Sequence, residues 1–136
     1  MDQDAYNSFC ASLPATSHVV QWRGAQVWKV GGALDGRAQH KVFAIATWVD
    51  GKSGGQHFGG KHNGITFKVS DIAFEVLPER DGLRPAPYLA SRGMKWIQHY
   101  AEPGFSDDEL KDYLTESHRL VALGLTKKLR VALGVG

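Results

Sequence analysis

The sequence has a single cysteine, little net charge and no long hydrophobic run. Cys10 alone can form neither an internal disulfide nor a cysteine metal cluster, which is typical of a protein in a reducing compartment. The chain begins MDQDAYNSFC, with acids where a secretory signal peptide would have basic residues. No apolar stretch approaches the roughly 20 residues that a membrane-spanning helix needs. We therefore predict a cytoplasmic protein with no membrane partner.

The formal net charge of +2 does not demand a polyanionic partner, but the charges are unevenly distributed. Residues 106–118 hold five acids and one lysine, whereas residues 119–136 hold four lysines or arginines and no acid. This pattern predicts one acidic helix in an otherwise basic chain. Because the solvated face of a helix also accounts for the acids, the charges alone select no function.

The length and composition are those of one globular domain. A chain of 136 residues with 43% hydrophobic and 22% charged residues can bury a core without disulfides or metal. It is too short to require a second domain. We predict a single domain over residues 1–136.

Hydrophobic spacing predicts an N-terminal helix and six strands. Tyr6, Phe9, Cys10 and Leu13 recur at helical spacing, so residues 3–13 should form an amphipathic helix that buries Cys10. The run KVFAIATWV is apolar on both alternations, which favours the centre of the sheet. Pro85 and Pro87 lack a backbone N–H, so the fifth strand is expected at an edge of the sheet. The predicted strands are 18–22, 25–30, 41–49, 64–70, 84–89 and 94–100.

The other segments have helical signals. A short helix should begin at Ser70 or Asp71, and Ser106 with Glu109 forms a capping box that opens a longer one. Gly124 is expected to end that helix in the left-handed conformation. A last helix should begin after the cap Thr126 and bear Leu129 and Leu133. The predicted apolar face of the short helix comprises Ile72, Ala73, Val76 and Leu77.

The predicted fold class is therefore α+β, a two-layer sandwich with helices packed on one face of an antiparallel sheet. The expected order is a helix, three to four strands, a helix, two strands and two helices. Within it Trp96 should be buried, whereas the glycine-rich loop from Gly51 to Gly64 should be mobile and dispensable for folding.

No pattern predicts a catalytic residue, a metal site or a cofactor. The GKS at 51–53 looks like the end of a Walker sequence, but Ala46 stands where its first glycine belongs and no helix follows. His57 and His62 lack a neighbouring carboxylate or thiol, so they make a weak metal site. Cys10 lies on a buried helical stripe, which favours packing over nucleophilic catalysis. We expect a protein that is not an enzyme.

Two stretches carry a resemblance to a known family. PYLASRGMKWIQHY and LKDYLTESHRLVALGLTKKLR, with KVFAI and ITFKVS earlier in the chain, resemble the MmcQ/YjbR family of small bacterial proteins. In that family the strand around Trp96 is followed by an acidic turn, a helix and a basic C-terminal segment. His118 stands where relatives often have tyrosine. The matching residues are Asp107, Leu110, Leu114, Ser117, His118, Leu120, Val121, Lys127, Lys128 and Arg130.

The resemblance implies a frataxin-like α+β fold, DNA binding through a double-wing arrangement, and no known cofactor or reaction. From the residues themselves we expect a basic and aromatic surface on one region of the sheet, beside Trp96, suited to phosphate contacts and base stacking. The candidate nucleic-acid-binding residues are Lys68, Arg84, Tyr88, Arg92, Lys95, His99, Lys127, Lys128 and Arg130.

Two other functions remain open from the sequence. The domain could bind a protein partner or itself through an open sheet face, or it could hold a small molecule in a pocket. A continuous basic stripe would favour nucleic acid, an exposed apolar sheet face would favour protein, and a deep polar cleft would favour a small molecule.

Overall fold

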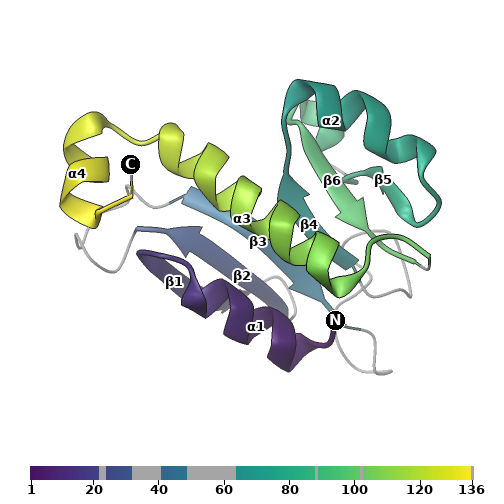
Figure 1. The fold of residues 1–136 in the computed structure, drawn as a ribbon, viewed down its shortest axis with the longest axis horizontal. Helices are drawn as coiled ribbons and strands as arrows, with labels where there is room; N and C mark the ends of the chain where they lie inside the picture. The colour runs from purple at the N-terminus through teal and green to yellow at the C-terminus, as the bar shows by residue number, and fades with distance from the viewer. Residues whose placement is uncertain (22–23, 32–40, 49–63, 88, 102, 136) are drawn as a thin grey trace.

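The computed structural model describes residues 1–136 apart from 22–23, 32–40, 49–63, 88, 102 and 136. Its centre is a six-stranded antiparallel sheet in the order β1-β2-β3-β4-β6-β5 (Figure 1). The predicted loop from Gly51 to Gly64 lies outside the described residues except for Gly64 itself. The strands are β1 Thr16–Gln21, β2 Ala25–Val30, β3 Lys41–Thr47, β4 Gly64–Lys68, β5 Leu83–Pro85 and β6 Trp96–His99.

Two longer helices cover one face of this sheet. Helix α1, Gln3–Ser12, and helix α3, Asp107–Leu123, lie side by side across the strands (Figure 1). Both begin at a side-chain cap, and α3 has the predicted capping box between Ser106 and Glu109. The shorter helices are α2 Asp71–Val76 and α4 Lys127–Leu133, with 3₁₀ turns η2 Leu77–Glu79 and η3 Ala90–Arg92.

The main core lies between the two helices and the sheet. Tyr6 and Cys10 of α1 are fully buried, as are Phe43 of β3 and Phe67 of β4, and Leu114 of α3 packs among them. Burial raises the pKa of the Cys10 thiol, which keeps the sulfur protonated. The expected packed thiol is confirmed, and so are the α+β class and the order of elements.

The opposite face of the sheet is also buried at its centre, on β2, β3, β4 and β6. Val27 and Ile45 form a second apolar cluster there with Leu89 packed against it. Thr66 alternates with core residues on β4 and therefore points to this face, where it and Gln98 are fully buried. We predicted an open sheet face that could bind a protein partner. Over these residues that prediction is wrong, because apolar packing and a polar network already cover the face.

Several local expectations need correction. The predicted apolar face of the short helix is confirmed only in part: Ala73 and Leu77 pack on the core together with Phe74, whereas Ile72 and Val76 are 78% and 55% exposed. The strand predicted over 94–100 forms only from Trp96 to His99.

The end of α3 also differs from the prediction. Gly124 ends the helix with φ −78°, in the right-handed region, because a tight turn leads directly into the cap of α4 at Thr126. The left-handed glycine expected there is wrong. The predicted cap of the last helix is confirmed, since the Thr126 side chain accepts from the Leu129 N–H.

Candidate nucleic-acid interface

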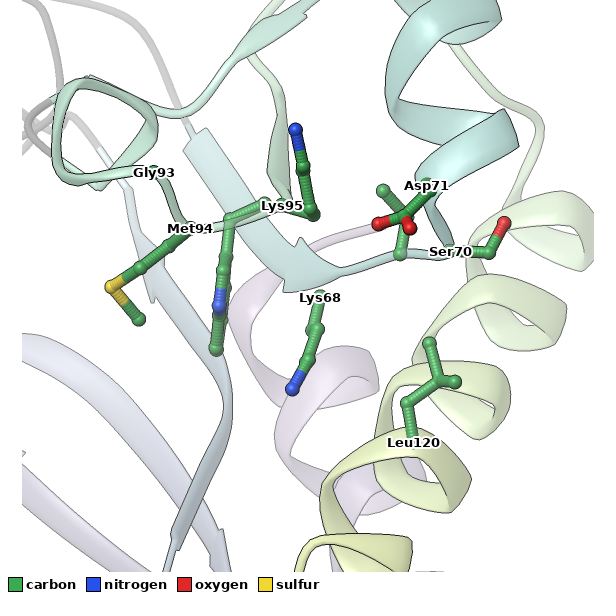
Figure 2. Close-up of a pocket in the computed structure, with 9 residues that line it drawn as sticks. Lys68, Ser70, Asp71, Gly93, Met94, Lys95 and Leu120 are labelled. Atoms are coloured by element: carbon green, nitrogen blue, oxygen red, sulfur yellow. The ribbon is translucent and has the colours of Figure 1, made fainter.

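An open pocket of about 500 Å³ lies where the end of β4, the start of α2 and the start of β6 meet α3 (Figure 2). Part of its wall is apolar and part is charged or hydroxylated. The lining residues are Lys68, Val69, Ser70, Asp71, Gly93, Met94, Lys95, Trp96 and Leu120.

Strand pairing brings the two lysines of the pocket together. Lys68 is the last residue of β4 and pairs with Trp96, the first residue of β6. The next hydrogen bond joins the Val69 N–H to the carbonyl oxygen of Lys95, at 3.0 Å. Lys68 and Lys95 therefore flank one end of the same strand pair, although they are far apart in the sequence.

Ser117 of α3 sets the geometry beneath Lys68. The register of β3 with β4 ends at Ala44 and Phe67, and the next partners in line are Phe43 and Lys68. There the Ser117 hydroxyl accepts from the Lys68 N–H at 2.9 Å and donates to the Phe43 carbonyl oxygen at 2.6 Å. A side chain thus replaces a direct bond between the strands, which diverge at this end (Figure 1).

The two ammonium groups point to different sides of the pocket. In Figure 2 the side chains of Lys68 and Lys95 extend in opposite directions from the paired strands. The Lys95 Nζ lies 4.9 Å from the centroid of the Phe74 ring, which holds the exposed cation by a cation–π contact. Arg92 is exposed in η3, directly before Gly93, whose φ of 79° makes the turn into this wall.

The pocket also holds a hydroxyl and a carboxylate. Ser70 caps α2, its side-chain oxygen accepting from the Ala73 N–H at 3.2 Å. Asp71 follows and contributes a negative charge to the wall at the start of α2 (Figure 2). The wall therefore carries two cations and, at the start of α2, one acceptor.

Arg84 lies apart from the pocket, on the edge strand β5. Its Nε and Nη2 donate to the Oε1 of buried Gln98 at 2.9 and 2.7 Å, and its guanidinium lies 4.3 Å from the centroid of Tyr100. Gln98 in turn donates to Thr66 at 3.3 Å. Gly64 leaves room for Gln98, because a Cβ there would lie 2.8 Å from its Nε2. Arg84 is thus committed to the buried network of the second sheet face.

His99 faces the helical side of the sheet. It pairs with Ile65 and Leu83, both core residues, and its ring stacks on Phe105 at a centroid distance of 6.4 Å. Gly104, with φ 49°, allows the chain to pass against the ring, since a Cβ there would clash with it. The structure therefore places His99 in packing rather than on the basic surface.

The remaining candidates do not line the pocket. Lys127 and Lys128 are exposed on α4 and Arg130 is half-buried there. Helix α4 lies at the opposite end of the molecule from β5 (Figure 1). Tyr88 lies outside the described residues. The basic surface expected from the sequence is thus divided: of the candidates only Lys68 and Lys95 line one cavity, and Arg92 directly precedes its lining residue Gly93.

Seven pocket residues were not among the candidates from the sequence: Val69, Ser70, Asp71, Gly93, Met94, Trp96 and Leu120. Ser70 and Asp71 had a signal, the start of a helix directly after a lysine-bearing strand. Leu120 had none, because its helical stripe predicted only core packing. In the described parts of the chain, the side chains form no cluster of three metal-ligating groups, and no helix is long and apolar enough to cross a membrane.

The chain is similar to a known protein family and to a solved structure. The model of the YjbR family matches residues 11–120, which is most of the chain. This protein belongs to the YjbR family. The crystal structure of Deinococcus radiodurans protein DR2400, whose domain is classed as DUF419, superposes with a TM-score of 0.75 at 20% identity, covering 98% of this chain and 88% of that one. None of the curated proteins matches the sequence. Family membership and fold are thereby established together.

Proposed function

We propose that this YjbR-family domain binds nucleic acid through phosphate contacts, without catalysing a reaction. The observation that carries the proposal is the pair of lysines, Lys68 and Lys95, that line one cavity, and the exposed Arg92 directly precedes its lining residue Gly93. Lysine and arginine contacts to phosphate oxygens position a protein on nucleic acid and carry no sequence information. The binding should therefore be sequence-independent.

The small number of cations at the pocket predicts modest affinity with a modest dependence on salt. If Lys68, Arg92 and Lys95 each contact one phosphate, log K should fall with log salt at a slope of about −3 on duplex DNA. The net charge of +2 agrees with a small electrostatic footprint.

Fluorescence anisotropy of a labelled oligonucleotide at several salt concentrations tests the proposal. Arg92→Ala with Lys95→Ala should weaken binding of all sequences alike and reduce the magnitude of the slope by about 2. Lys95→Ala alone should reduce it by about 1. Lys111→Ala is the matched control, because Lys111 is also exposed but lies over Phe9 on the side of α1.

The proposal fails if the parent protein shows no salt-sensitive binding, or if the double variant binds as the parent does. In either case, interaction with a protein partner becomes the favoured function, for which the exposed Ile72 and Val76 of α2 offer an apolar pair one helical turn apart. Circular dichroism of each variant would establish that the fold is retained.

A further inference from the structure

The pocket is larger and more apolar than a phosphate contact requires. Exposed lysines alone suffice to hold the backbone of a duplex. This open cavity of about 500 Å³ instead has a volume within the range of pockets that hold organic ligands. Val69, Met94, Trp96 and Leu120 supply an apolar wall. The cavity therefore has room for a flat apolar group in addition to the phosphates at its rim.

The charges of the pocket indicate which part of a nucleotide enters. Lys68 and Lys95 extend to opposite sides, so each can meet a phosphate on either side of one nucleotide (Figure 2). Asp71 lines the same cavity and would repel a phosphate inside it. Its carboxylate can instead accept a hydrogen bond from an exocyclic amino group, as acidic side chains do from cytosine N4.

The apolar wall of the pocket is suited to a base that is already unpaired. In a duplex the faces of the bases are stacked and their Watson–Crick edges are occupied, so entry would require extrusion of a nucleotide against its stacking and pairing energy. In a single strand the faces and edges are free. Met94, 39% exposed, and half-buried Leu120 offer apolar contact at the mouth, while Trp96, 5% exposed, forms the inner wall.

We propose that the pocket takes one unpaired base, so that the nucleic acid bound by this domain is single-stranded. This inference rests on the proposed function and specifies its ligand. The phosphates lie on Lys68 and Lys95, the base lies against Leu120 on the α3 side of the cavity, and Asp71 faces the amino edge of the base.

Three labelled probes separate the two proposals. They are a single-stranded deoxycytidine oligomer of about 12 nucleotides, an abasic strand of the same length, and a duplex. The deoxycytidine strand should bind at least about tenfold more tightly than either other probe, since contacts to unpaired bases contribute on that scale. Equal binding of all three would overturn the single-strand inference and leave phosphate binding standing. Binding of none would overturn the proposed function.

Pocket-filling variants locate the base. Leu120→Trp should remove the preference for deoxycytidine over abasic strand, while salt-sensitive binding of the abasic strand persists. Leu123→Trp is the matched control, one turn along the same helix, 49% exposed and outside the pocket lining. Met94→Trp gives a second test at a more exposed position of the mouth. A preference unchanged in folded Leu120→Trp and Met94→Trp proteins would overturn the assignment of the base to this pocket.

Discussion

His118 is hydrogen-bonded to the carbonyl oxygen of Pro14, with 2.7 Å between Nε2 and the oxygen. A carbonyl oxygen only accepts, so Nε2 carries the proton. The imidazole is buried and meets the Phe43 ring edge-on at a centroid distance of 5.2 Å. The contact ties α3 to the turn that joins α1 to β1, and thus joins both helices of the layer to the sheet.

This histidine predicts a loss of stability on mild acidification. Burial lowers the pKa of His118, and the hydrogen bond to Pro14 opposes that shift. The unfolded chain therefore takes up the proton more readily than the folded one. The contribution to stability is present above the ordinary pKa of 6.5 and is lost as the pH falls through the folded pKa.

Urea unfolding between about pH 8 and about pH 5 measures this effect. His118→Gln should be less stable at high pH, because packing against Phe43 is lost, but its stability should fall less as the pH is lowered. A parallel loss in both proteins over this range would contradict the prediction.

Glu109 predicts a second, more acidic transition. The bidentate contact with Arg80, at 2.9 Å for each bond, and then the backbone hydrogen bond from Ser106 lower the pKa of Glu109 from 4.5 to about 2. Since the folded state favours the charged form, this contribution is present above 4.5 and is lost as the pH falls toward 2. Glu109→Gln should flatten the stability profile in that window, and Arg80→Gln should do the same. An unchanged profile in both variants would show that the pair does not act on folding.

Removal of the Ser117 hydroxyl should destabilise the fold without changing the surface. Ser117→Ala leaves the buried Lys68 N–H and Phe43 carbonyl without this shared partner, which should cost about 1–3 kcal/mol. Thr115→Ala is the control, because its exposed hydroxyl bonds only within α3, to the Lys111 carbonyl oxygen. Denaturant midpoints give the comparison. Equal midpoints for the two variants would mean that β3 and β4 close directly on each other when the hydroxyl is absent.

Truncation of Trp96 should be the most damaging of these changes. The side chain is 5% exposed, as the sequence predicted, and its loss leaves a large cavity beside the paired strands. Trp96→Ala should lower the free energy of unfolding by about 3–5 kcal/mol. The neighbouring Met94→Ala, at an exposed position, should have a much smaller effect. Thermal stability unchanged in Trp96→Ala would remove the structural role assigned to this residue.

Sequence alone determined the features that depend on neighbours in the chain. The start of α3 at Ser106 and of α4 at Thr126 could be read directly, because a helix cap is a hydrogen bond to a backbone N–H three residues away. The central position of β3 followed from its unbroken apolar run. The motifs in the last part of the chain predicted the family by resemblance, and the match over residues 11–120 confirmed it.

Tertiary structure decided everything that depends on which surfaces meet. Helical spacing placed Ile72 and Val76 on the buried stripe of α2 with Leu77, yet both are exposed and Phe74 packs with Leu77, because the direction from which the sheet approaches is not a local property. The same holds for the basic residues. Composition could not separate Arg84, held by a buried glutamine, from Lys68 and Lys95, which the register of β4 with β6 places around one cavity. Strand register arises from pairing distant segments, and the pocket exists only once that pairing has formed.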